Sequence, residues 1–199
     1  MYRKYVKRLF DIIISCILFV ITLPILIIVI PLNILSIGLP IYNVLRYRIG
    51  KDNKIYLMYK IRTKKIGKEY VHDGSQFSRF SKIIDATRIN EIPQFINVIK
   101  GDMSLIGPRP YIPGEGFDSE RFYKRHSVRP GLTGLAQIKG GRFISFDKKE
   151  YYDNYYADNV NFWLDLKIFL LTPFAIIKQT INFNKLYKKW FLVAKYVKI

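Results

Sequence analysis

The sequence is poor in the residues that build disulfides and transition-metal sites. Its 199 residues include one cysteine, Cys16, and two histidines, His72 and His126. A single cysteine excludes an intramolecular disulfide and a cysteine-based metal site, and it weakly favours a reducing compartment. Any metal is therefore expected to be a hard cation bound through oxygen, such as magnesium.

Acidic residues are also scarce, with 15 Asp and Glu against 33 Lys and Arg, although half of the chain is hydrophobic. The resulting charge of +18 attracts nucleic acid, anionic lipid or phosphorylated ligands, and charge alone does not choose among them. No Walker-type phosphate loop and no dinucleotide-binding glycine pattern are present. There is no internal repeat or low-complexity linker, so we treat residues 1–199 as a single domain.

Charge is absent between Asp11 and Arg46. This apolar run is long enough to cross a bilayer, which takes about 20 residues, and too long for the core of a secretory signal. Pro24 interrupts it, and a proline inside a helix bends the axis. Basic residues lie on both sides, with Arg3, Lys4, Lys7 and Arg8 before the run and Arg46, Arg48 and Lys51 after it. The positive-inside rule places both flanks in the cytoplasm, so we predict that residues 1–40 form a re-entrant membrane helix kinked at Pro24, with a simple membrane-spanning anchor as the alternative.

The C-terminal region has a related character. Residues 161–180 form an apolar segment, and residues 183–199 interleave aromatic side chains with lysines. That mixture is typical of an amphipathic helix in the headgroup layer, and a solvated basic tail is the alternative. Because the N-terminus is so apolar, we expect a phospholipid membrane as a partner, and no nucleic acid.

The middle of the chain predicts a mixed fold. Residues 41–62 read as a β-hairpin around the turn at 50–53, and residues 64–78 as a polar surface loop. Apolar spacing predicts helices over 80–89 and 91–100, with Gly101 as a stop. Two rigid loops rich in proline and glycine follow, at 107–116 and 128–141. The expected fold class is α+β and mostly helical, with one hairpin, a catalytic region over residues 41–182 and the tail at 183–199.

Both proline- and glycine-rich loops carry an arginine next to proline, Arg109 in "GPRP" and Arg129 in "VRPG". Arginine offers a fixed fork of donors that fits phosphate oxygens, and neighbouring prolines limit the freedom of the backbone that presents it. For one such loop alone, a solvated turn is the favoured explanation. Two loops beside Glu91 and Asp102 move the balance toward a phosphate site, although Asp102 could instead be a helix-end residue.

At this point the sequence resembles a known family. The stretches "NEIPQFINVIKGDMSLIGPRP" and "VRPGLTGLAQ" are similar to the signature of bacterial sugar transferases, the monotopic phosphoglycosyl transferases. The proline-broken N-terminal helix, "YRIGKDNKIYLMYKIRT", Asp153 before a Tyr-containing stretch, and "LDLKI" extend the resemblance over residues 4–180.

The resemblance implies a magnesium-dependent enzyme on the cytoplasmic face of the bacterial inner membrane. It would transfer a phosphosugar from a UDP-sugar to polyprenyl phosphate and release UMP, as the first membrane step of capsule, exopolysaccharide or lipopolysaccharide assembly. The family mechanism is ping-pong, through an aspartyl phosphate formed on an Asp-Glu pair. The resemblance places Asn90 and Glu91 at that pair, as catalytic residues and magnesium ligands. It implies substrate contacts for Arg88, Arg109, Arg129, Gln137 and Arg142, and it leaves a homodimer open.

The sequence departs from the family at the expected nucleophile, because Asn90 stands where an aspartate is usual. An amide is a poor nucleophile, whereas Asn and Asp are similar helix N-caps and Pro93 suits a first helical turn. Three explanations stay open: a natural variant that uses direct attack by the lipid phosphate or Glu91 as nucleophile, a non-catalytic binding relative, or an asparagine introduced to trap a complex. Two further departures are Leu135, where the family often has a tryptophan, and Arg142, which lies one position later than the corresponding arginine of the family. The identity of the sugar therefore cannot be transferred from the family to this chain.

Overall fold

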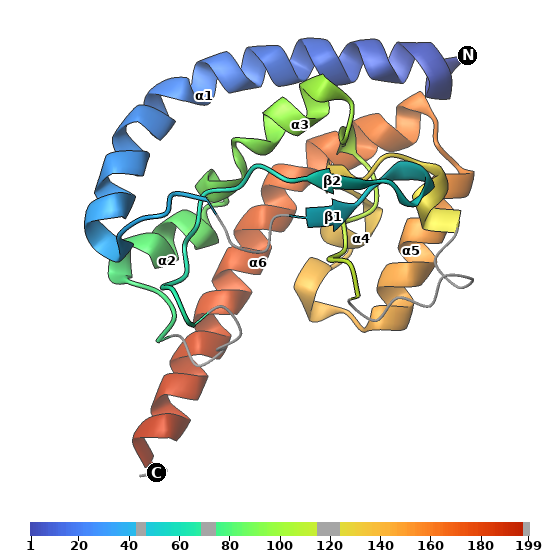
Figure 1. Ribbon diagram of the computed structural model, residues 1–199. Helices are drawn as coiled ribbons and strands as arrows, with labels where there is room; N and C mark the ends of the chain where they lie inside the picture. Colours follow the sequence, from blue (N-terminus) through green and yellow to red (C-terminus); the bar gives the residue numbers. More distant parts are fainter. Residues whose placement is uncertain (43–46, 69–74, 115–123, 197–199) are drawn as a thin grey trace.

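The computed structural model is α+β and mostly helical, as predicted (Figure 1). It describes the backbone of residues 1–42, 47–68, 75–114 and 124–196, and the side chains of these residues except 142 and 182–196. The helices and strands are, in chain order, α1 (Lys7–Ile37), β1 (Tyr47–Ile49), β2 (Ile55–Leu57), α2 (Arg79–Ala86), α3 (Gln94–Lys100), β3 (Ser104–Ile106), β4 (Gly131–Thr133), α4 (Leu135–Ile138), α5 (Phe146–Asp158) and α6 (Phe162–Tyr196).

The apolar N-terminal run forms one long helix, α1, which curves strongly along its length (Figure 1). Pro24 and Pro31 both lie inside it, and prolines in a helix interior remove hydrogen bonds and bend the axis. The helix ends at Gly38, which has a positive φ of 73°. Among the described residues, the segment Tyr2–Ile37 alone is long and apolar enough to cross a membrane.

The first turns of α1 are bound to the folded domain. The Arg8 guanidinium donates to the carbonyls of Val98 (2.6 Å) and Ile99 (2.8 Å), where it caps the C-terminal turn of α3. Asp11 is buried and accepts a hydrogen bond from the backbone N–H of Leu105 at 3.0 Å. Removing either partner would leave a buried charge or donor unsatisfied, so this end of α1 is fixed on α3 and β3.

The last turns of α1 are bound to the same domain. Arg62, 1% exposed, donates to the carbonyls of Ile37 and Gly38 at the end of the helix. Asn33 donates to the Arg62 carbonyl at 2.8 Å. Cations favour helix C-termini because the last carbonyls lack partners. Both ends of the curved helix are therefore bound to one folded domain, which a straight membrane-spanning helix would not allow.

The predicted hairpin is confirmed, with shorter strands than expected. β1 and β2 pair antiparallel around residues 50–54, and a bridge between Tyr42 and Ile61 extends the ladder. Asp52 and Asn53 have positive φ values, as a tight turn requires. The predicted loop at 64–78 contains an antiparallel bridge between Lys64 and Phe77, and its residues 69–74 lie outside the described part.

A second sheet was not predicted. β3 and β4 form a parallel pair: β4 lies inside the predicted loop at 128–141, and β3 directly precedes the predicted loop at 107–116. Glycine permits this pairing: a Cβ on Gly131 would lie 2.1 Å from the Gly107 nitrogen, and one on Gly134 would lie 2.1 Å from the Gly107 oxygen. The parallel pair brings the two proline-braced loops together.

The predicted helices are shorter, and the junction between them differs. α2 begins with a reciprocal cap between Ser78 and Ser81, and α3 ends at Gly101 with φ 97°, as expected. The interpretation of Asn90 as an N-cap is wrong. Asn90 lies in a 3-10 turn (Ile89–Glu91), Pro93 holds the N-cap position of α3, and no side-chain cap is present.

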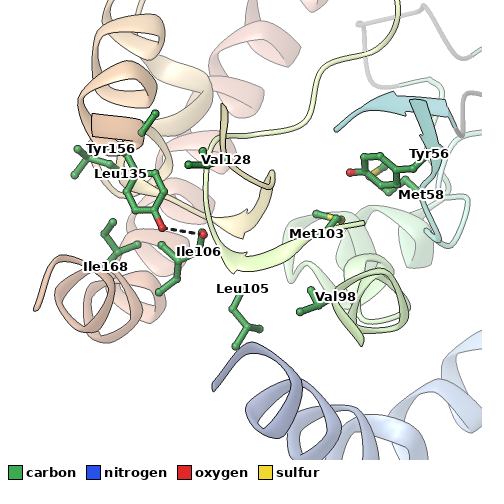
Figure 2. Packing of buried hydrophobic residues seen from close by; sticks show 11 residues of the cluster. Tyr56, Met58, Val98, Met103, Leu105, Ile106, Val128, Leu135, Tyr156 and Ile168 are labelled. Carbon is green, nitrogen blue, oxygen red and sulfur yellow. Dashed lines mark hydrogen bonds between the residues drawn. The ribbon is translucent and has the colours of Figure 1, made fainter. Parts of the chain in front are cut away.

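The core lies between these elements and α5 and α6 (Figure 2). Tyr156 donates from its hydroxyl to the Asp165 carboxylate at 2.7 Å and contacts the Ile106 carbonyl at 3.0 Å. Asp165 also pairs with Lys7 at 2.9 Å. One buried carboxylate thus joins α1, α5 and α6. The core cluster comprises Tyr56, Met58, Val98, Met103, Leu105, Ile106, Val128, Leu135, Tyr156, Ala157 and Ile168.

Candidate active site

A cavity of about 580 Å³ opens where α2, α4, α5 and α6 meet the segments that follow β2 and β3. This volume falls within the range of small-ligand sites, about 300–1,000 Å³. Its lining carries more cations than carboxylates. The charged side chains around it are Lys60, Lys64, Asp85, Arg88, Arg109, Lys149 and Asp153. The cavity suits an anionic ligand of nucleotide-sugar size.

Two predicted phosphate-binding residues, Arg88 and Arg109, line this cavity. Within the described part of the chain, the Arg109 guanidinium makes no hydrogen bond or ion pair, so its fork of donors is available to a ligand. Arg88 has φ 64°, a left-handed conformation that a non-glycine residue adopts at a cost. Such strain is concentrated at binding and active sites, and Arg88 lines the cavity.

Glu91 is held between two cations. Its Oε1 accepts from Lys60 Nζ at 2.9 Å and from Arg88 at 3.1 Å. Burial alone would raise the pKa of Glu91, but Lys60, Arg88 and the more distant Arg109 together lower that pKa below its usual range. Glu91 is therefore ionised at neutral pH and serves as a fixed counter-ion to these basic groups. Lys60, on the chain after the hairpin, was missed in the sequence because nothing local distinguishes it from other lysines.

Asn90 is completely buried and does not line the 580 Å³ cavity. Its Nδ2 donates to the Oδ1 of Asp85 at 3.1 Å, and its Oδ1 has no partner among the described residues. Asp85 does line the cavity. Asn90, the residue expected to react, is therefore buried outside the cavity, and Asp85, a carboxylate that the sequence did not single out, lines the cavity beside it.

A second carboxylate of the cavity, Asp153, is buried and paired with Arg125 at 2.9 Å. The Arg125 guanidinium lies 3.8 Å over the Tyr111 ring. Burial raises the pKa of Asp153 to about 6, although Arg125 and Arg109 act in the opposite direction. The Arg125–Asp153 pair braces the cavity wall below Tyr111.

An apolar groove of about 260 Å³ adjoins the polar cavity. Its walls come from α1, α3, β4 and α6, and its apolar side chains include Leu18, Phe95, Leu132, Phe169 and Ile176. Four residues line both hollows, namely Arg88, Arg109, Gln137 and Gln179. A polar cavity and an apolar groove therefore meet at a pair of guanidiniums.

Of the remaining predicted site residues, some line the two hollows and others lie elsewhere in the fold. Gln137 lines both hollows, and Gln179 Nε2 donates to its carbonyl at 2.6 Å. Arg129 lines neither, because its Nε donates to the Gly101 carbonyl at 2.8 Å beside Arg8. The Arg142 side chain lies outside the described part. Lys7, Arg8 and Pro24, predicted as membrane residues, belong to α1, where Lys7 and Arg8 bind Asp165 and α3 carbonyls.

Comparison with known proteins agrees with this geometry. Residues 2–179 match the family model described as bacterial sugar transferase. The chain is 38% identical over 174 residues to the uncharacterised sugar transferase EpsL of Bacillus subtilis (strain 168). It is 37% identical over 188 residues to the UDP-N-acetylgalactosamine-undecaprenyl-phosphate N-acetylgalactosaminephosphotransferase of Aeromonas hydrophila. It is 34% identical over 184 residues to the UDP-glucose:undecaprenyl-phosphate glucose-1-phosphate transferase of Klebsiella pneumoniae.

The extent of these matches differs among the relatives. The alignments cover 83%, 87% and 84% of this chain, respectively. They cover 84% of EpsL, but only 44% of the Aeromonas protein and 39% of the Klebsiella protein. The chain therefore spans less than half the length of the two relatives whose names state a reaction.

Proposed function

Because the chain belongs to the bacterial sugar transferase family, we propose that it transfers a phosphosugar from a UDP-sugar to a polyprenyl phosphate such as undecaprenyl phosphate and releases UMP. The observation that carries the proposal is the meeting of the polar cavity and the apolar groove at Arg88 and Arg109. A water-soluble donor and a lipid acceptor must both present a phosphate at one point for this reaction.

The polar cavity would hold the donor. A UDP-sugar carries a diphosphate, which the Arg109 fork can bind bidentately, with Arg88 on the same wall. The amides of Gln137 and Gln179 also face this space and can bond to hydroxyl or carbonyl groups. Positioning and charge stabilisation supply most of the catalysis in phosphoryl transfer, and this lining offers both.

The apolar groove would hold the acceptor. Its aliphatic and aromatic lining suits a polyprenyl chain, and its shared wall puts the lipid phosphate beside Arg88 and Arg109. The groove is bounded by Leu18 of α1 and by Phe169 and Ile176 of α6. Both helices expose large apolar side chains, among them Val20, Ile27, Trp163 and Phe174. An apolar face of this kind on each helix supports contact of the groove with a membrane.

Magnesium was expected with Asn90 and Glu91 as ligands, and the two side chains differ in how well they fit it. Asn90 is enclosed and does not reach the cavity. Glu91 lines the apolar groove beside Arg88 and Arg109, and its Oε2 makes no hydrogen bond or ion pair within the described part of the chain, so Glu91 would hold the ion there. Magnesium is commonly bound by one or two carboxylates together with substrate phosphates, where it neutralises phosphate oxygens. The magnesium requirement stays a prediction.

The activity assay uses the purified chain in lipid nanodiscs with UDP-N-acetylgalactosamine, UDP-galactose and UDP-glucose, each with and without undecaprenyl phosphate. We expect repeated turnover to UMP with at least one donor, only when undecaprenyl phosphate is present, together with a lipid-linked phosphosugar. No lipid product with any donor would overturn the proposal and favour a non-catalytic membrane module that binds polyprenyl phosphate.

We further propose a monotopic arrangement, with both ends of α1 on the cytoplasmic side. It is supported by the curvature of α1 and by the attachment of both of its ends to one domain (Figure 1). In a Cys16→Ser background, we expect Lys4→Cys and Leu39→Cys both to react with a membrane-impermeant maleimide in inverted membrane vesicles and neither to react in intact spheroplasts. Lys148→Cys, exposed on α5, is the matched control. Labelling of positions 4 and 39 from opposite sides would show a spanning helix.

A further inference from the structure

We propose that Asp85 is the nucleophile that receives the phosphosugar and that Asn90 is a positioning residue that holds it. The inference rests on the proposed function and deepens it. Asp85 lies in the last turn of α2, five residues before the position where the family resemblance placed the reactive carboxylate. Its side chain lines the 580 Å³ cavity together with Arg88 and Arg109.

The hydrogen bonds of Asp85 leave one oxygen available. Asn90 Nδ2 at 3.1 Å and the Thr63 hydroxyl at 3.3 Å both donate to Oδ1. Within the described part of the chain, Oδ2 has no hydrogen-bond or ion-pair partner. Two donors on one oxygen fix the plane of the carboxylate, and the second oxygen is free to attack. Preorganisation of this kind lowers the barrier by removing the need to orient the reacting group.

The buried amide explains why residue 90 need not be acidic. Asn90 is 0% exposed, so an aspartate there would be a second carboxylate beside Asp85 in a closed space. Like charges so close raise the pKa of one member of the pair and weaken it as a nucleophile at neutral pH. An amide instead offers a donor to Asp85. The asparagine and the aspartate therefore fit each other as a pair.

The other carboxylates near the cavity are less suited. Glu91 is bound by Lys60 and Arg88, and it lines the apolar groove rather than the 580 Å³ cavity. Asp153 is buried and paired with Arg125. Among the described residues that line this cavity, Asp85 is thus the acidic side chain without a cationic partner. Its reactive oxygen is not already neutralised.

The proposed chemistry is balanced over two displacements. Asp85 Oδ2 attacks the phosphorus that bears the sugar, the P–O bond to the UMP moiety breaks, and UMP leaves with the electron pair. This yields an aspartyl phosphosugar on the enzyme. A phosphate oxygen of the polyprenyl phosphate then attacks the same phosphorus, and the Asp85 carboxylate leaves. Arg88 and Arg109 line both hollows and can neutralise the phosphate in both steps.

The test maps the intermediate in the unaltered chain. The donor that supports transfer is added without undecaprenyl phosphate, and UMP release, intact protein mass and peptide mass after hydroxylamine treatment are measured. We expect a burst of UMP stoichiometric with enzyme, a mass gain of one phosphosugar, and an Asp85 hydroxamate. Transfer that proceeds with an adduct on Glu91, or with no burst and no adduct, would overturn the Asp85 assignment while the proposed function stands. Absence of transfer with every donor overturns both.

Substitutions provide the second arm. Asp85→Asn keeps the shape of the side chain and should abolish the burst and lower transfer by about 1,000-fold or more. Asp85→Glu should keep a measurable burst, and Asn90→Ala should lower the burst rate while the adduct stays on Asp85. Thermal unfolding checks that each variant is folded. If Asp85→Asn retains transfer, or if Asn90→Asp carries the adduct at residue 90 with higher activity, Asp85 is not the nucleophile.

Discussion

Gly131→Ala is expected to destabilise the protein by at least about 4 kcal/mol, enough to prevent the accumulation of folded chain. A Cβ at this position would lie 2.1 Å from the Gly107 nitrogen and 2.4 Å from the Thr133 oxygen. Both are backbone atoms, one in the residue that follows β3 and one in β4, so no flexible side chain can move aside. The measurement is the thermal unfolding midpoint in detergent, together with the yield of monodisperse protein.

Gly67→Ala is the matched control for this prediction. Gly67 has a positive φ of 75°, but among the described residues no atom beyond its chain neighbours lies within 4 Å of the added Cβ. Its cost should be limited to the conformational penalty of about 1–2 kcal/mol for a left-handed residue. Gly131 has no positive φ, so its requirement for glycine rests on the close approach of β3 and β4, and equal losses of stability at the two positions would contradict the prediction.

Arg109→Lys is expected to lower kcat/KM by about 100- to 1,000-fold, the range measured when one preorganised donor to a developing charge is removed. Lysine keeps the charge but lacks the bidentate fork. Because Arg109 lines both hollows, UMP release without acceptor and transfer to the lipid should both slow. The assay is the UMP and lipid-product measurement described above, on variants with unchanged thermal unfolding.

The control for Arg109 is Arg79→Lys, on the exposed side of α2 and away from both hollows. We expect this variant to turn over like the unaltered chain. A loss below threefold for Arg109→Lys, or a comparable loss for Arg79→Lys, would indicate that Arg109 supplies general positive charge and makes no specific contact with phosphate.

The features predicted from sequence are those that local rules determine. The uncharged run with Pro24 predicted α1, the turn at 50–53 predicted the β1–β2 hairpin, and Gly101 marked the end of α3. In each case the signal lies within a few residues of the feature. The resemblance to the family placed Arg88, Arg109 and Gln137 in the site, and these three residues do line the cavity.

The features that were missed depend on contacts between distant segments. β3 and β4 are short and parallel, and residues 104 and 131 pair across 26 intervening positions, which leaves no alternation or turn to detect. The same pairing separates Arg109 from Arg129, which looked equivalent in sequence. Arg109 continues into the cavity beyond β3, whereas Arg129 precedes β4 and caps α3 at Gly101.

The position of Asp85 was missed for a different reason. The motif drew attention to residues 90 and 91, but the left-handed Arg88 turns the chain between α2 and the 3-10 turn. That turn carries Asn90 inward and leaves Asp85 at the cavity surface. The backbone torsion at Arg88 thus decides which side chain near this turn faces the ligand. The spacing of residues in the sequence does not reveal that torsion.

The wall shared by the two hollows has a kinetic consequence. Arg88 and Arg109 can neutralise one transferring phosphate at a time, so a nucleotide diphosphate and a lipid phosphate bound together would repel each other across the same pair of cations. In the proposed reaction, occupancy by either ligand would thus lower the affinity for the other, and thermodynamic linkage would make this mutual antagonism equal in both directions. An excess of either substrate would then slow turnover, and the flux of lipid-linked sugar would be greatest at balanced supplies of donor and acceptor.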